Sequence, residues 1–150
     1  MSRKTIIFLF ILILAPVIIY SLWPSDESRI RKIFREGAKA IEQEKIEEVM
    51  ARVSFNYADD YGLTYLYVRE VMTRVFQRMD GIKIEYEITG IDITDTRATA
   101  ELDIRVIASQ GSDTGYAVGD AARPVHMTFT LEKERTTWLV TKTQGLPLNF

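Results

Sequence analysis

The chain has 150 residues, which is the size of one domain. Its apolar share of 47% and charged share of 27% are typical of a folded globular protein and exclude a disordered chain. There is no cysteine, so disulfides, thiolate nucleophiles and cysteine-ligated metals are excluded. The net charge of −2, without a basic stripe, excludes nucleic acid as an expected partner.

The N-terminal segment, residues 1–24, predicts a membrane anchor. Arg3 and Lys4 precede an uncharged run from Thr5 to Trp23. At about 1.5 Å per residue this run covers roughly 28 Å, close to the ~30 Å hydrocarbon core of a bilayer. A cleaved signal peptide is the alternative, but its apolar region is usually shorter and ends in small residues. We therefore expect the segment to stay attached, as an anchor or an uncleaved signal.

The charges beside this run point in two directions. Two basic residues precede it and four follow it between Arg29 and Arg35, and by the positive-inside rule this excess places the following domain in the cytoplasm. A short basic tail before an apolar run is, however, the ordinary export signal. We favour a single-pass membrane protein whose domain lies on the non-cytoplasmic (periplasmic) side.

Three helices are predicted after the anchor, because apolar residues recur there at helical spacing. The first follows Pro24, with Ser25 or Asp26 as its N-cap. The third takes Asp59 or Asp60 as its N-cap and carries a long apolar stripe. The expected helices cover roughly residues 26–43, 46–53 and 61–79.

The pattern then changes to a period of two, which predicts a curved four-stranded antiparallel sheet covered on one face only. In the first long strand the apolar parity of Ile82 to Ile88 shifts at Ile91, which predicts a bulge at Thr89–Gly90. Residues 109–123 are expected to form a long hairpin loop. Helices first and strands afterwards is the α+β order, so the three helices should pack on one face of the sheet.

The stretches SFNYADDYGL and LEKERTTWLVTKTQGLPL, with this order of elements, resemble the nuclear transport factor 2-like (cystatin-like) superfamily. In detail the chain is similar to membrane-tethered bacterial members of unassigned function. The resemblance covers about residues 25–148, within a domain expected over residues 25–150. It implies a cone-shaped fold with a pocket between the helices and the concave sheet face, which is catalytic in some relatives and binds a ligand in others. Because the resemblance includes no catalytic motif, it predicts the fold rather than an activity.

A cluster of tyrosines and acids is the candidate site. Large rings with a polar tip suit the wall of a cavity that accepts a mostly apolar ligand. Asp59 and Asp60 are the candidate acid/base pair, although one is expected to cap the third helix and the other to point to solvent, where a carboxylate is a weak base. The candidates for lining the pocket are Tyr57, Tyr61, Tyr65 and Trp138.

Two functions are compatible with these residues. The first is a non-catalytic binding or protein-interaction module, held at the membrane by its N-terminal helix, with a small apolar ligand or a protein as its partner. The alternative is an enzyme of the isomerase or dehydratase type that uses the Tyr/Asp cluster. The resemblance implies a carboxylate base with an oxyanion hole, or tyrosines with a histidine–aspartate pair, and neither set matches this chain.

Other partners are not expected. The only histidine, His126, has the parity of the polar strand positions and is predicted to lie on the surface. No second histidine is available to complete a metal site, so we expect no metal and no cofactor. Without Arg3 and Lys4 the chain has 17 basic against 21 acidic residues, a net charge of −4, which again argues against nucleic acid. The sequence leaves open whether the chain forms a homodimer.

Overall fold

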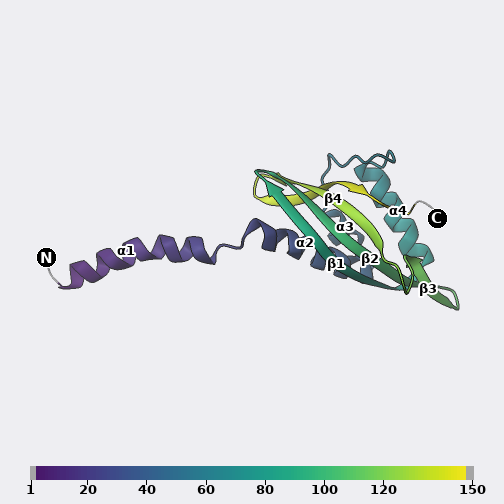
Figure 1. The fold of residues 1–150 in the computed structure, drawn as a ribbon, viewed down its shortest axis with the longest axis horizontal. Helices are drawn as coiled ribbons and strands as arrows, with labels where there is room; N and C mark the ends of the chain where they lie inside the picture. Colours follow the sequence, from purple (N-terminus) through teal and green to yellow (C-terminus); the bar gives the residue numbers. More distant parts are fainter. Residues whose placement is uncertain (1–2, 148–150) are drawn as a thin grey trace.

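The computed structural model describes residues 3–147, in which an isolated helix precedes an α+β domain (Figure 1). The isolated helix is α1, Arg3–Leu22, and it extends away from the domain. Its large apolar side chains from Ile7 onward are exposed, Phe8 at 67% and Leu22 at 76%. A helix that is apolar on every side is normally buried in a protein core or in lipid.

Length and composition alone do not make α1 a membrane span. Among the described residues no single helix is both long and apolar enough to cross a bilayer, although Ile7–Leu22 and Asp26–Glu42 together, bent by 41°, meet the criterion. The second of these helices is α2, Asp26–Glu42, whose residues Ile30 and Ala40 are buried in the domain. The span predicted for residues 1–24 therefore stays a prediction.

The first two helices of the domain begin where the sequence places them, although the second ends at Met50 and not at residue 53. Ser25 is the N-cap of α2, and its Oγ accepts a hydrogen bond from the backbone N–H of Ser28 at 3.1 Å. The short helix α3, Ile46–Met50, buries Val49 and Met50. Both helices therefore turn an apolar face to the domain.

The third predicted helix begins later than the sequence suggests. It is α4, Tyr65–Arg78, with Thr64 at its N-cap position, so the expectation that Asp59 or Asp60 caps it is wrong. The preceding residues 51–64 form an irregular strap along the edge of the sheet instead. Val53 forms a parallel bridge with Val140, and the backbone N–H of Ala58 donates to the carbonyl oxygen of Thr141 at 3.1 Å.

The sheet has five antiparallel strands, and the prediction of four was wrong by one. The additional strand is β3, Asp113–Val118, which pairs with the end of β2 inside the stretch predicted to be a loop. This strand lies between Gly111 and Gly119 and mixes polar with apolar residues. It therefore lacks the clear apolar/polar alternation that marks the other strands. The order is β1-β2-β4-β5 with β3 beside β2, and the other strands are β1 Asp80–Thr94, β2 Arg97–Gln110, β4 Val125–Glu134 and β5 Thr137–Gln144.

The bulge predicted in β1 is confirmed. Ile88 pairs with Leu102 and Gly90 with Glu101, so Thr89 is the extra residue. Ile91 therefore returns to the same apolar face as Ile88. That face carries the core, in which Ala98, Ala100, Leu102, Leu131 and Trp138 are buried beneath the helices.

Candidate functional site

Asp59 organises the strap rather than a helix. Its Oδ1 accepts hydrogen bonds from the backbone N–H groups of Tyr61 and Leu63, both at 2.9 Å, in the manner of an Asx turn. Its Oδ2 accepts the hydroxyl of Tyr57 at 3.0 Å. Both carboxylate oxygens therefore have structural partners within the strap.

Tyr57 is part of the core and not of a cavity wall. It is 5% exposed, and burial raises the pKa of its hydroxyl to about 12. A hydroxyl with so high a pKa is a weak acid at neutral pH. The structure thus brings Tyr57 and Asp59 together as a buried anchor for the strap.

Asp60 lies at the edge of the sheet with its side chain 59% exposed, as expected for the second of the two acids. It forms an ion pair with Lys142 of β5 at 2.7 Å and accepts a hydrogen bond from the side chain of Gln144 at 2.8 Å. The hydrogen bond from Lys142 is the main cause that lowers the pKa of Asp60. A carboxyl with a lowered pKa is a poor general base at neutral pH.

The two remaining tyrosines lie apart from this anchor. Tyr61 belongs to the strap, outside any helix, and is 43% exposed. Tyr65 is the first residue of α4, packs against the core, and has its ring 4.5 Å from that of Phe55. Tyr61 therefore does not share a helix with Tyr65, although the third helix was predicted over residues 61–79.

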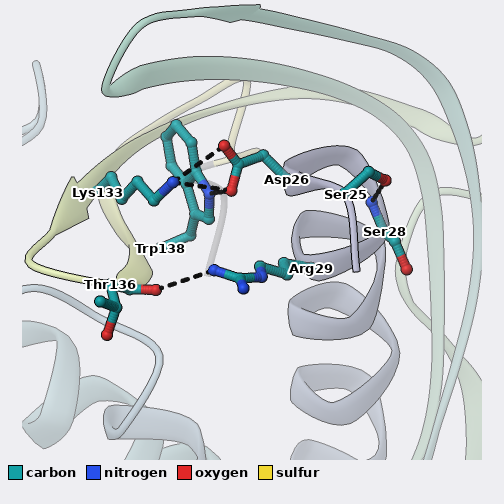
Figure 2. Close-up of polar contacts among 7 residues, drawn as sticks. All are labelled: Ser25, Asp26, Ser28, Arg29, Lys133, Thr136 and Trp138. Atoms are coloured by element: carbon teal, nitrogen blue, oxygen red, sulfur yellow. Dashed lines mark hydrogen bonds and ion pairs between the residues drawn. The ribbon is translucent and has the colours of Figure 1, made fainter. Parts of the chain in front are cut away.

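Trp138, the fourth candidate for the pocket wall, is 2% exposed and belongs to the core. Its indole Nε1–H donates to a carboxylate oxygen of Asp26 at 2.9 Å (Figure 2). The ammonium group of Lys133 reaches the two oxygens of Asp26 at 3.0 Å each. Asp26 stands in the first turn of α2, whereas Lys133 and Trp138 are paired across β4 and β5. We call these three residues the latch.

The hydrogen bonds of the latch favour the ionised form of Asp26. The hydrogen bond from Trp138, followed by that from Lys133, lowers the pKa of Asp26. Three residues after Asp26, the guanidinium of Arg29 donates to the carbonyl oxygen of Thr136 in the β4–β5 turn at 3.4 Å (Figure 2). The first turn of α2 is thus fastened to this hairpin at two points.

Sequence reasoning missed the latch, although one signal was available. Lys133 has the same parity as Leu131, so it is a lone charge on the apolar face of β4. A charge in such a position needs a partner of opposite sign. Nothing in the sequence indicated that Asp26 is this partner, because an acid in the first turn of a helix is explained by the helix dipole alone.

The only histidine is exposed, as predicted. His126 lies on the face of the sheet that the helices leave open, and its Nδ1 is 2.8 Å from a carboxylate oxygen of Asp103 on the neighbouring strand. Its side chain is 56% exposed. The pair therefore lies on the opposite side of the sheet from the tyrosines and Trp138.

Neither of two surface hollows contains a predicted site residue. One, of about 470 Å³, lies around the β1–β2 turn and is lined by Asp92, Thr94, Asp95, Thr96, Arg97, Thr99 and Glu132. The other, of about 250 Å³, lies between Met79 and the β2–β3 hairpin. In the described part of the chain, no three His, Asp or Glu side chains are arranged to hold a metal ion.

The concave side of the domain has incompletely covered apolar side chains. Helix α4 has no buried residue, although its apolar stripe packs in part against the core through Val68. Helix α2 covers the neighbouring part of the same face, where Phe34 packs edge-on against Phe129 at 5.1 Å between ring centroids. Half-buried apolar residues of α4 are Val68, Val71, Met72, Val75 and Phe76, and those on the inner face of the sheet are Ile84, Tyr86, Ile88, Ile104 and Phe129.

Known structures share this arrangement. A scytalone dehydratase-like protein from Novosphingobium aromaticivorans matches with a TM-score of 0.66 at 12% identity, over 79% of this chain and 80% of its own. A domain with a cystatin-like fold from Nostoc punctiforme matches with 0.62 at 21% identity, over 82% and 79%. A ketosteroid isomerase-like protein from Erwinia carotovora atroseptica matches with 0.62 at 15% identity, over 77% and 91%.

These comparisons establish that the chain has the nuclear transport factor 2-like (cystatin-like) fold. No model of a protein family matches the sequence, and no curated protein is similar to it. At identities of 12% to 21% the likeness is one of fold, and one fold hosts many unrelated functions.

Proposed function

We propose that this protein is a membrane-anchored binding module that takes up an apolar small molecule or an apolar segment of a protein. The observation that carries the proposal is α4, whose apolar stripe has no buried residue and stays half exposed. Ligand sites are mostly apolar, concave surfaces with few polar groups. An apolar ligand placed between α4 and the sheet would cover the side chains that the fold itself does not.

The isolated helix α1 supports the membrane part of this proposal. Its apolar side chains are exposed on all sides, which is costly in water and favourable in lipid. With Arg3 and Lys4 at its start, the helix has the features of an export signal that is retained as an anchor. We place the domain on the non-cytoplasmic side for that reason.

The polar groups of the domain favour binding over catalysis. Both oxygens of Asp59 are occupied within the strap, and Asp60 is held by Lys142 and Gln144. The histidine lies on the open face of the sheet. An isomerase or dehydratase is the second candidate, favoured by the likeness to proteins described as ketosteroid isomerase-like and scytalone dehydratase-like.

Photocrosslinking tests the proposal. The full chain, reconstituted in vesicles, is irradiated with a long-chain alkyl diazirine, and the labelled peptides are mapped by mass spectrometry. We expect label on α4 and on the concave strands, reduced by Phe76→Ala and by excess unlabelled alkane. Leu66→Ala is the matched control, because Leu66 is an apolar residue of the same helix that is 74% exposed.

Two results would contradict the proposal. Label confined to α1 would show that the concave side takes up no apolar ligand. Turnover in an isomerase or dehydratase assay that is lost in Asp60→Asn, with folding intact, would favour the enzyme.

A further inference from the structure

The connection between α1 and the domain is short. Helix α1 ends at Leu22 and α2 begins at Asp26, so only three residues separate the two helices. At about 3.5 Å per extended residue they span roughly 10 Å. One of them is Pro24, whose ring fixes its φ angle, and another is Ser25, which is held as the N-cap of α2. The connection is therefore stiff as well as short.

The latch prevents this connection from lengthening. Unwinding the first turn of α2, Asp26 to Arg29, would add four residues and extend the connection to roughly 25 Å. Asp26 is held by Lys133 and Trp138, and Arg29 by the β4–β5 turn, so the first turn cannot unwind without breaking these contacts. The latch thus fixes where the domain begins relative to the end of α1.

The same contacts determine which end of the domain lies next to α1. The β4–β5 turn contacts α2 directly, and the β1–β2 turn lies beside it, since the backbone N–H of Lys133 donates to the carbonyl oxygen of Thr96 at 2.8 Å. The β2–β3 turn is at the other end of β2 (Figure 1). A strand of 14 residues at about 3.3 Å each separates these ends by roughly 46 Å.

The residues at this junction suit the surface of a bilayer. Trp23 is 64% exposed at the domain end of α1, and the guanidinium carbon of Arg29 lies 5.8 Å from the centre of its ring. Tryptophan is enriched where lipid meets water, and arginine binds phosphate. A bilayer that surrounds α1 would therefore place its headgroups at Trp23 and Arg29.

From these contacts we propose that the end of the domain with the β1–β2 and β4–β5 turns is a fixed contact face for the phospholipid surface, and that the latch holds it there. The β2–β3 hairpin then points away from the membrane. Asp26 is a positioning residue in this arrangement, because it acts through α2 and not on a ligand. The inference rests on the proposed anchoring by α1.

Single cysteines test the orientation, because the chain has none of its own. Thr96→Cys and Ser112→Cys place a fluorophore on the β1–β2 turn and the β2–β3 turn, respectively. The labelled full chain is reconstituted in phosphatidylcholine vesicles that contain a lipid with a nitroxide on its headgroup, a short-range quencher. We expect quenching to be severalfold stronger at position 96 than at position 112.

The latch is tested in the same vesicles. Asp26→Ala should lower the ratio of the two quenching values toward one, whereas Glu27→Ala, a change of the exposed neighbour, should leave it unchanged. A Gly-Gly-Ser insertion after Trp23 lengthens the connection without touching the latch, so it should lower the ratio even if Asp26→Ala does not fold.

The outcomes separate this inference from the anchoring on which it rests. Failure of the chain to float with the vesicles would overturn the anchoring by α1. A chain that floats but shows equal quenching at both positions would overturn the contact face. An unchanged ratio in folded Asp26→Ala would overturn the role of the latch.

Discussion

Replacing Asp26 by alanine is the most informative perturbation of the domain. The change leaves the indole N–H of Trp138 without a partner in a side chain that is only 2% exposed. A buried donor without a partner costs about 1–3 kcal/mol, and loss of the charge-assisted bonds from Lys133 adds about 1 kcal/mol. We therefore expect Asp26→Ala to lower the free energy of unfolding by about 2–4 kcal/mol.

Thermal unfolding of the full chain in detergent measures this loss. For a domain of this size about 1 kcal/mol corresponds to about 3–4 °C, so the Tm should fall by about 6–15 °C. Near-ultraviolet circular dichroism follows the environment of the two tryptophans, of which Trp138 is buried and Trp23 is exposed. Glu27→Ala is the matched control, because Glu27 is in the same turn but pairs only with exposed Arg31. A Tm for Asp26→Ala equal to that of Glu27→Ala would refute the reasoning.

The pH dependence of a second variant, Asp26→Asn, gives a further check. Because the pKa of Asp26 is lowered in the folded state, its contribution is complete above the ordinary carboxyl pKa of about 3.9 and is lost as the pH falls through the lower folded value. The difference in Tm between wild type and Asp26→Asn should therefore be largest near neutral pH and shrink below about pH 4. A constant difference down to pH 2 would contradict an ionised Asp26 in the latch.

Three further predictions concern the strap and the end of β5. Since burial raises the pKa of Tyr57 to about 12, the folded state should lose about 2–3 kcal/mol of stability as the pH rises from 10 to 12, and Tyr57→Phe should abolish this loss in alkaline denaturant titrations. Asp59→Ala should lower the Tm more than Asp60→Ala, because Asp59 holds three donors of the strap whereas Asp60 is exposed; equal shifts would contradict the Asx turn. Gly145→Ala should destabilise by about 1–3 kcal/mol in urea unfolding, since its φ is +87° and a Cβ would overlap the carbonyl oxygen of His126; an unchanged midpoint would refute this.

The fold was predictable where local pattern and tertiary structure agree. The parity change between Ile88 and Ile91 located the bulge, because every side chain on one face of a strand must meet the same core. Gly90 was a poorer guide: its φ is not positive and a Cβ there would make only ordinary contact. The bulge therefore does not depend on the backbone freedom of glycine, and Gly90→Val should introduce little backbone strain.

The start of the third helix shows where sequence reasoning fails. An aspartate followed by an apolar stripe is compatible with an N-cap and equally with an Asx turn, and the choice depends on what the strap contacts. Here Asp59 serves the turn and Thr64 precedes the helix. Similarly, the parity of Trp138 placed it on the inner face, but parity does not distinguish a packed core from a cavity wall.

The latch could not be predicted from the sequence for a different reason. Its partners are separated by 107 and 112 residues, so no local spacing connects them. Only the position of Lys133, a charged residue on an otherwise apolar strand face, indicated that a partner of opposite sign was needed. Which of 21 acidic residues fills that role is decided by the packing of α2 on the sheet.

Fractionation of cells that express the full chain tests the central claim, membrane anchoring by α1, most directly. The measurement is the mass of the chain in the membrane fraction after alkaline carbonate extraction, which removes peripheral proteins. We predict that the intact 150-residue chain stays in the membrane pellet and that the domain is cleaved by protease added to cells with a permeabilised outer barrier. A soluble form that begins near Leu22 would contradict the anchor, and a domain that resists the protease until the cells are lysed would contradict its orientation.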